Sequence, residues 1–316
     1  MLTKIFFTTD LHGSDECFLK FINSGKFYKT SVIICGGDIT GKMMIPLIAT
    51  QDGGYEAEFL GRTQKVRDDE VSQLEKSIAQ AGYYPFKTTK EELSHLNTDR
   101  DKVEKLFSEL MMQRVKKWIE IAEQRLRNTG IKCIINAGND DRIEIDTVLD
   151  TSDFIIHAEG KVVDIDGKHE MISTGYTNIT PWNCPRDISE TDLAERIEHM
   201  TSKVSNMKNC LFNFHCPPFN STIDTAPKLD SNLKPVVSGG GEVELIPVGS
   251  TTVRTAIEKY QPLLGLHGHI HESKGSTKIG RTLCINPGSE YGEGILRGAL
   301  VTIEDDKIKS FQFTSG

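Results

Sequence analysis

Five short segments carry side chains of the types that bind divalent metal ions. Imidazole, carboxylate and amide groups all serve as metal ligands in proteins. Side chains two residues apart in an extended chain point to the same side, so Asp10 and His12 can face one ion, and His269 and His271 can face one pocket. Glycines before several of these residues permit tight turns and close backbone approach. The segments are Asp10-Leu11-His12, Gly36-Gly37-Asp38, Gly138-Asn139-Asp140-Asp141, His215 and Gly268-His269-Ile270-His271.

Each segment also has an ordinary structural explanation when it is taken alone. An aspartate and a histidine two residues apart often occur by chance, and Gly-Gly-Asp or Gly-Asn-Asp runs are typical of turns. His215, which shortly precedes Pro217 and Pro218, could be a buried core histidine. A histidine pair directly after Gly268 is less common. The presence of all five segments in one chain, each after an apolar run, favours a shared site.

The segments follow apolar runs that are typical of buried strands. These runs are residues 4–9, 31–35, 132–136, 209–214 and 263–267. They alternate with helical patterns over residues 15–27, 101–127, about 189–204 and about 251–260, which predicts an α/β architecture. Ligands of open α/β sheets bind beyond the carboxyl ends of the strands. We therefore expect five strand ends to bring seven potential ligands to one place.

Other segments resemble hairpins, and one stretch resembles an insertion. Asp166-Gly167 is a strong turn signal between residues 161–165 and 168–173, and residues 299–303 and 308–313 form a second candidate pair. Residues 42–98 separate the second predicted strand from the long helix. We expect this stretch to be an insertion with a hairpin (45–50 with 55–61) and a helix near 69–80. It is either a solvated decoration or a cap over the site.

The ordered set of motifs resembles the calcineurin-like metallophosphoesterase superfamily, in particular its uncharacterised prokaryotic phosphodiesterase-like branch. The motifs extend from Asp10 to His271, and Asn286-Pro287-Gly288-Ser289 is similar to a turn common in smaller phosphodiesterase members. The resemblance covers most of the chain apart from residues 42–98. It implies an α/β fold in which two mixed β-sheets are flanked by helices, a four-layer αββα sandwich. It also implies a single domain over residues 1–316.

The resemblance implies a dinuclear metal centre and a hydrolytic activity. Two divalent ions, Mn, Fe, Zn or Co with manganese favoured, suit the mixed nitrogen and oxygen ligands. The implied reaction is hydrolysis of a phosphodiester, or else a phosphomonoester, by a hydroxide held between the ions. The implied ligands of one ion are Asp10, His12 and His271, those of the other are Asn139, His215 and His269, and Asp38 bridges both.

The chain departs from the resemblance at the third motif. Many members have a histidine where this sequence has Asp140, and that histidine assists the transition state or protonates the leaving group. An ordinary aspartate has a pKa near 3.9 and is a poor acid at neutral pH. We therefore expect Asn139 and Asp140 to be the catalytic candidates, with the acid role of Asp140 open. Arg142 is a candidate phosphate contact or a surface ion pair. Asn178, Thr180 and Trp182 are candidates for the pocket rim, and His267 for orienting a ligand.

Composition and charge narrow the classes of protein to which this chain could belong. A formal net charge of −8 argues against a nucleic-acid-binding face, and neither a signal peptide nor an apolar stretch long enough to span a membrane is predicted. The seven cysteines include no CxxC pair and are expected to be reduced thiols. We expect a cytoplasmic enzyme that acts on a small phosphoester and has no membrane partner. The alternatives are a metal-binding protein-interaction scaffold of the same fold and a nuclease.

Overall fold

The first sheet of the protein contains the first three motif-bearing strands. The computed structural model describes residues 2–316. Strands β1, β2 and β7 run parallel to one another, so their carboxyl ends lie at one edge. In spatial order the sheet comprises β20 (Lys307–Ser315), β19 (Arg297–Glu304), β1 (Leu2–Thr8), β2 (Val32–Cys35), β7 (Lys132–Ile135) and β8 (Ile156–His157).

The second sheet contains the two remaining motif-bearing strands. Strands β10, β13, β16 and β18 are parallel, whereas β9 and β17 pair antiparallel at the two edges. In spatial order the sheet comprises β17 (Gly275–Ile279), β18 (Thr282–Asn286), β16 (Leu264–Leu266), β13 (Leu211–Phe214), β10 (Glu170–Thr174) and β9 (Val162–Asp164). Both sheets are mixed, as expected.

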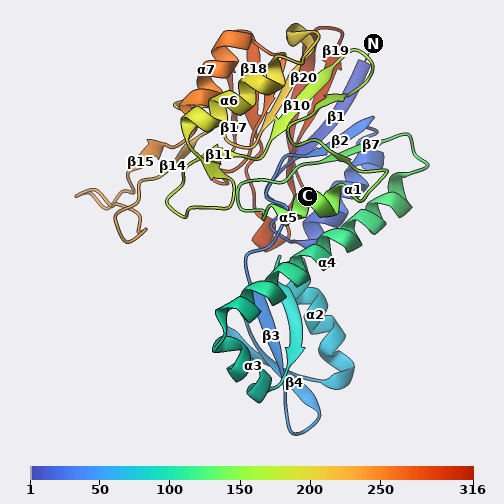
Figure 1. Ribbon diagram of the computed structural model, residues 1–316, viewed down its shortest axis with the longest axis vertical. Helices are drawn as coiled ribbons and strands as arrows, with labels where there is room; N and C mark the ends of the chain where they lie inside the picture. Colours follow the sequence, from blue (N-terminus) through green and yellow to red (C-terminus); the bar gives the residue numbers. More distant parts are fainter. Residues whose placement is uncertain (1) are drawn as a thin grey trace.

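Alternation of apolar side chains along the strands places the two sheets face to face. In β1, Ile5 and Phe7 point into the core between the sheets, whereas Phe6 points into the core on the opposite face. Helices α1 (Asp15–Phe27), α4 (Arg100–Leu126) and α5 (Glu144–Leu149) cover the outer face of the first sheet. Helices α6 (Glu190–Thr201) and α7 (Thr251–Tyr260) cover the second (Figure 1). The predicted four-layer αββα sandwich is confirmed.

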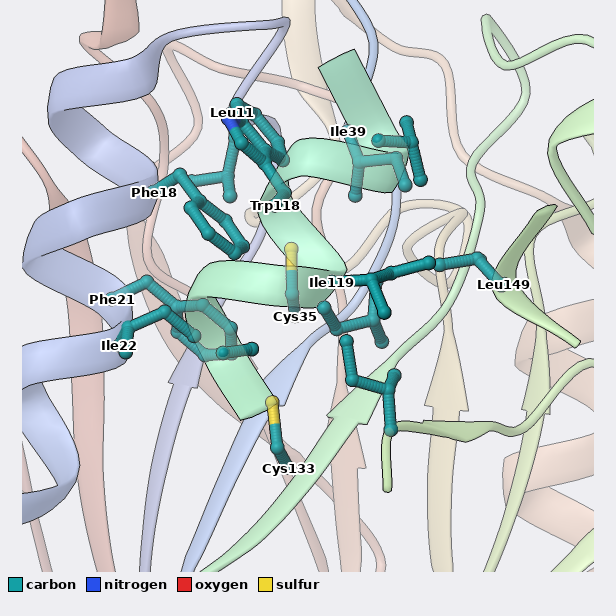
Figure 2. Packing of buried hydrophobic residues seen from close by; sticks show 14 of the residues in the cluster. Leu11, Phe18, Phe21, Ile22, Cys35, Ile39, Trp118, Ile119, Cys133 and Leu149 are labelled. Atoms are coloured by element: carbon teal, nitrogen blue, oxygen red, sulfur yellow. The ribbon is translucent and has the colours of Figure 1, made fainter. Parts of the chain in front are cut away.

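The helical layer on the first sheet is held by close apolar packing. Figure 2 shows Phe18 of α1 stacked against Trp118 of α4, with ring centroids 4.2 Å apart and planes 5° from parallel. The Trp118 indole Nε1 donates to Asp15 at 2.6 Å, so its polar edge is satisfied where α4 crosses α1. Cys35 and Cys133 face this core from the sheet. All seven cysteines, which lie within the described residues, are free.

Side-chain caps set the starts of the predicted helices. Ser14 accepts a hydrogen bond from the Cys17 amide at the start of α1, and Ser189 accepts from the Asp192 amide at the start of α6. The cap of α7 is Ser250, whose side chain accepts from the Val253 amide, so the helix begins where the pattern predicted it. The hairpins β9–β10 and β19–β20 are confirmed.

Residues 42–98 form a lobe with its own sheet, which is more than the expected hairpin and helix. Strand β3 pairs antiparallel with β4 as predicted, but β5 extends the pair and β6 runs parallel to β3. Ile45, Leu47, Phe59, Leu74 and Ile78 belong to a separate apolar core, and Figure 1 shows the lobe projecting from the sandwich. The lobe comprises β3 (Met44–Ala49), β4 (Gly54–Phe59), β5 (Arg62–Arg67), α2 (Val71–Gln80), β6 (Tyr84–Thr88) and α3 (Lys90–Asn97).

The lobe is joined to the metal-motif loops through backbone contacts. A Cβ atom on Gly41 would lie 2.1 Å from the carbonyl oxygen of Gly82, and one on Gly82 would lie 2.4 Å from the carbonyl oxygen of His12. The Tyr84 hydroxyl accepts from the Gly41 amide at 2.7 Å. Arg114 of α4 donates to the carbonyl oxygen of Gly13 at 2.6 Å and to that of Tyr83 at 3.2 Å. The lobe therefore packs directly against the loops after β1 and β2.

The remaining elements are short. They are the strand pairs β11 (Thr177–Asn178) with β12 (Asp187–Ile188) and β14 (Thr225–Pro227) with β15 (Leu245–Pro247). Short 3-10 helices cover Asp68–Glu70, Met207–Asn209 and Tyr291–Glu293. Within residues 2–316, no helix is both long enough and apolar enough to cross a membrane.

Candidate metal centre

The five motif-bearing strand ends meet at one edge of the sandwich. His215 Nε2, after β13, lies 3.4 Å from Asp38 Oδ2 and 3.7 Å from Asp10 Oδ1. His271 Nε2 lies 3.3 Å from Asp10 Oδ1 and 3.0 Å from His12 Nε2. The structure thus brings together side chains that are up to about 260 residues apart in the chain, as the strand-end argument predicts.

The candidate ligand atoms fall into two neighbouring groups, and the Asp38 carboxylate lies close to both. In one group, the candidate ligand atoms of Asp10, His12 and His271 all lie within 4.8 Å of one another. In the other, those of Asp38, His215 and His269 do so. Asp38 Oδ2 is also 3.7 Å from His12 Nε2, so this carboxylate borders both groups. The side-chain amide oxygen of Asn139, Oδ1, lies 2.9 Å from His269 Nδ1 and completes the second group.

Unpaired nitrogen atoms show that these residues fit metal ions. His215 is fully buried, yet neither ring nitrogen has a hydrogen-bond partner, and His12 Nδ1 is also buried and unpaired. A buried imidazole without partners is costly, whereas a metal ion would use its lone pair. Asp10 and Asp38 supply buried carboxylates beside these rings. Imidazole nitrogens and carboxylate oxygens in this number suit first-row transition metals.

The electrostatics of the metal-free site keep most ligands in the form that binds metal. Burial opposes ionisation of Asp10 and Asp38, but the surrounding histidines together outweigh it, His215 first among them, and hold the pKa of both carboxyls below their usual range. Burial lowers the pKa of His12 and of His269 to about 4, so both rings are neutral near pH 7. Burial also lowers the pKa of His215, but Asp38 and Asp10 raise it to about 9. His215 must therefore release a proton when an ion binds.

Four of the seven side chains are carried by residues with left-handed backbone. The φ angles are 56° at Asp10, 41° at His12, 50° at Asp38 and 68° at His269. This region is unfavourable for residues other than glycine, and such conformations persist where the surrounding structure enforces them. The Asp10 amide donates to the Gly37 carbonyl and the His12 amide to the Asp38 carbonyl, both at 2.9 Å. The loops after β1 and β2 thus hold each other in the strained form.

Asp141 ties the second and third motifs together from behind. Its buried carboxylate accepts from the amides of Ile39, Thr40 and Gly138 at 2.8–2.9 Å. Burial, followed by the nearby Asp38 charge, raises the pKa of Asp141 to about 6. A Cβ atom on Gly138 would lie 2.2 Å from Asp38 Oδ1, so only glycine allows this approach. Asp141 therefore positions the loops that carry the ligands.

Asp187, which sequence reasoning missed, orients the Asn139 amide. Asn139 Nδ2 donates to Asp187 Oδ1 at 3.1 Å, which turns the amide oxygen toward His269. The other Asp187 oxygen accepts from the amides of Thr180 and Cys184 at 2.9 and 3.0 Å. A single aspartate at the start of the two-residue strand β12 carries no motif, so the sequence offers no signal for this role.

A pocket of about 380 Å³ opens beside the two ligand groups. Trp182 lines it and is 62% exposed, as expected for a rim residue. Asn178 and Thr180 do not line it; the first accepts a hydrogen bond from Cys216 and the second donates to Asp187. Within the described chain, Lys42 is the only residue of the lobe that lines it, and none of the strands and helices of the lobe does. Its lining comprises Asp38, Lys42, Asn139, Asp140, Trp182, Cys184, His269, His271 and Glu272.

Asp140 lies in the pocket, but its carboxylate already has partners. The backbone amide of Asp140 donates to Asp38 Oδ1 at 3.0 Å. Its carboxylate forms an ion pair with the Lys42 ammonium and accepts from the Cys184 thiol at 2.8 Å. A carboxylate that accepts in this way has no proton to donate to a leaving group. Lys42 and Cys184 are further residues that the sequence did not single out.

Arg142 points away from the pocket. Its guanidinium donates to Ser108 Oγ at 2.7 Å, pairs with Glu104 and lies over the Phe107 ring, all on α4. This placement gives no support to the expected phosphate contact and matches the alternative of an ion pair.

Residues behind the site shape its loops. His267 Nδ1 lies 2.8 Å from the Phe214 carbonyl oxygen and 3.0 Å from that of Cys216, so the ring packs behind the ligands. The Asn286 amide donates to the Ile270 carbonyl at 3.0 Å. The Ser289 hydroxyl donates to the Asp10 carbonyl at 2.7 Å. The turn at 286–289 therefore supports the loops that bear Asp10 and the histidine pair.

Comparison of the sequence with known proteins finds a relative over part of the chain. No protein-family model matches the sequence. The uncharacterised protein MJ1162 of Methanocaldococcus jannaschii is 30% identical over 152 residues, which are 48% of this chain and 61% of that protein. The chain thus spans less than two thirds of that relative.

Solved structures extend the likeness over the whole chain. TT1561 of Thermus thermophilus is similar with a TM-score of 0.54 at 12% identity, over 99% of both chains. Another crystal structure is similar with a TM-score of 0.55 at 14% identity, also over 99% of both chains. At these identities the likeness concerns the fold. The two facing mixed sheets, their helical layers and these structural neighbours show that the chain has the calcineurin-like fold.

Proposed function

We propose that this protein is a metal-dependent phosphoesterase that uses two divalent ions, with manganese favoured, to hydrolyse a small phosphodiester or phosphomonoester. The ligands proposed for one ion are Asp10, His12 and His271, with Asp38 between the ions. Those proposed for the other are Asn139, His215 and His269.

The observation that carries the proposal is the state of His215. Its ring is fully buried between Asp10 and Asp38; neither nitrogen has a hydrogen-bond partner, and Nε2 lies 3.7 Å from Asp10 Oδ1 and 3.4 Å from Asp38 Oδ2. Neighbouring buried polar groups in the same loops, such as Asp141, are satisfied by several hydrogen bonds. A buried imidazole that makes no hydrogen bond and lies within 4 Å of two buried carboxylates is the arrangement of ligands that a bound cation would satisfy.

When bound, a pair of divalent ions lowers the pKa of water toward about 7 and stabilises negative charge on phosphoryl oxygens. The chain positions the ester for this chemistry. The pocket beside His269 and His271 admits a small ester, and Trp182 gives it an apolar rim. Asp187 keeps the Asn139 amide oxygen directed at the second ligand group. None of the pocket side chains is a nucleophile paired with a base: the Cys184 thiol donates a hydrogen bond to Asp140, and burial raises the pKa of this thiol to about 12.

A reconstitution experiment tests this function. Metal-free protein is loaded with Mn, Co, Zn or Fe, the ions per chain are counted, and bis-aryl and mono-aryl phosphate esters are assayed side by side. We expect two ions per chain and metal-dependent turnover. His215→Ala is expected to lose one ion and at least about 100-fold in activity, because metal-site residues of this kind carry losses of that order or greater.

His199→Ala is the matched control, because His199 is an exposed histidine on α6. It is expected to retain both ions and full turnover. A protein that binds two ions but hydrolyses neither ester contradicts the enzyme proposal and supports the scaffold. A protein that binds no ion contradicts the metal centre itself.

A further inference from the structure

Lys42 places a positive charge in the pocket beside the metal centre. Among the lining residues within the described chain, it is the only lysine or arginine. Its side chain is 50% exposed, so the ammonium is open to a ligand in the pocket. A phosphoester is an anion, and a fixed cation in a partly desolvated pocket attracts it more strongly than a cation in open water does.

The surrounding structure holds Lys42 in place. The adjacent Gly41 is anchored by the Tyr84 hydroxyl and by its contact with Gly82. The ammonium is paired with Asp140, and the Cys184 thiol donates to the same carboxylate. The Asp140 amide in turn donates to Asp38. A chain of contacts therefore connects the ammonium to the carboxylate that borders both ligand groups.

The Lys42 ammonium keeps its positive charge. Burial would lower the pKa of Lys42 itself, but Asp140 outweighs burial and raises it. The ammonium thus stays charged near neutral pH, in the pocket that His271 of the first ligand group also lines.

We propose that Lys42 binds a phosphoryl oxygen of the substrate, and that Asp140 is a positioning residue that aims the Lys42 ammonium. This inference rests on the proposed phosphoesterase function. Lys42 remains protonated throughout and moves no proton. It stabilises the negative charge on the phosphoryl group, and this charge stabilisation takes the place of leaving-group protonation by Asp140. An ester with a poor leaving group should depend on Lys42 as much as one with a good leaving group.

Four variants test the pair: Lys42→Met, Lys42→Arg, Asp140→Asn and the double variant Lys42→Met/Asp140→Asn. Steady-state kinetics are measured on aryl phosphate esters with good and poor leaving groups. Inorganic phosphate binding to the metal-loaded protein is measured by calorimetry. Lys203→Met is the control, because Lys203 is exposed beyond the end of α6 and does not line the pocket. Ion content and thermal unfolding confirm that each variant is folded and loaded.

We expect Lys42→Met to lower kcat/KM at least about tenfold for both esters and to weaken phosphate binding; removal of one charge-stabilising donor typically costs about 100- to 1000-fold in kcat. Lys42→Arg should recover part of both losses. Asp140→Asn should cost less than Lys42→Met, and the double variant should be no worse than Lys42→Met, because the two residues act as one unit.

Three outcomes overturn the inference. The first is a Lys42→Met variant with kcat/KM and phosphate binding within twofold of the wild type. The second is an additive double variant. The third is an Asp140→Asn loss confined to the poor leaving group, which would make Asp140 an acid. If the wild-type protein turns over no ester, the proposed function fails instead, and the phosphate-binding arm alone decides whether Lys42 contacts phosphate.

Discussion

Asp187 reaches the candidate metal centre only through the Asn139 amide. Its oxygen accepts from Nδ2 at 3.1 Å, and a carboxylate imposes one orientation on that amide because it can only accept. In Asp187→Asn the new side chain can also donate, so the Asn139 amide is no longer held with its oxygen toward His269. We expect metal affinity to fall about 10- to 100-fold at one of two sites, as for other residues that orient a metal ligand.

The metal affinity of each site is measured by calorimetric titration of metal-free protein with Mn or Co. Asp101→Asn on the exposed first turn of α4 serves as the control. Equal affinity at both sites in Asp187→Asn would contradict the orienting role.

Buried neutral histidines make the metal-free protein sensitive to acid. The pKa of His12, His267 and His269 is lowered to about 4, first of all by burial. A depressed folded pKa means that the unfolded chain binds more protons between about pH 4 and 6.5, so stability is lost as the pH falls through this window. Asp141, with its pKa raised to about 6, offsets part of the loss below pH 6. His215, with its pKa raised to about 9, loses its contribution only as the pH rises toward 9.

We expect the free energy of unfolding in EDTA to fall between pH 7 and pH 5. Each of the three histidines contributes a loss of about 2 kcal/mol, since one pKa unit corresponds to about 1.4 kcal/mol. His267→Asn keeps a donor near the position of Nδ1 but cannot titrate. The free energy of unfolding of this variant should therefore fall less between pH 7 and pH 5 than that of the wild type, by about 2 kcal/mol. Urea unfolding at the two pH values measures the difference. A wild-type protein more stable at pH 5 than at pH 7 would show that the sign is wrong.

At the residue scale, the sequence could indicate the side chains that carry their own motif. Asp10, Asp38 and the histidine pair stand at strand ends next to glycine, and that spacing reflects the geometry of the site directly. Asp187 and Lys42 could not be found in this way. Their roles come from loops that fold back onto the site, and neither loop has a periodic pattern that fixes where its side chains lie.

The joint between lobe and sandwich depends on glycine at position 41. A methyl group there would lie 2.1 Å from the Gly82 carbonyl oxygen, a backbone atom that cannot move aside alone. We expect Gly41→Ala to destabilise the protein by about 1–3 kcal/mol or more, the range for overpacking. Metal affinity should also fall, because Gly41 follows the Asp38 loop.

Urea unfolding and ion content measure both effects. Gly239→Ala is the matched control, since neither glycine has a positive φ and a Cβ at position 239 would meet nothing within 4 Å. If the two variants behaved alike, the joint would not depend on this contact.

At the element scale, prediction succeeded where apolar periodicity and capping agreed. Strands β1, β2, β7, β13 and β16 are short buried runs, and α1, α4 and α6 have clear caps. The lobe was harder because β5 consists largely of exposed polar residues and β6 pairs with β3, about 40 residues earlier in the chain. Strand β18 was missed although it is fully buried, because its run is short and lies between two segments without helical pattern.

For the whole molecule, bound ions should raise thermal stability. Ions that bind only the folded state add about 2.7 kcal/mol per site at a hundredfold excess over Kd. For a chain of this size, the sum over two sites corresponds to an increase in Tm on the order of 10 °C. Thermal unfolding with Mn and with EDTA measures the difference, and the His215→Ala variant should show a smaller one. A Tm that is the same with Mn and with EDTA would contradict the binding of two ions at this edge of the sandwich.

The contact among Gly13, Gly41 and Gly82 limits which amino-acid substitutions this chain can accept during evolution. When two side chains touch, a larger group on one can be accommodated by a smaller group on the other, so paired replacements are tolerated. Here the main chain of each partner touches the main chain of the next, and no replacement elsewhere can make room. Homologues that carry the lobe in this position should therefore retain all three glycines together, whereas those without it should be free to vary at Gly41.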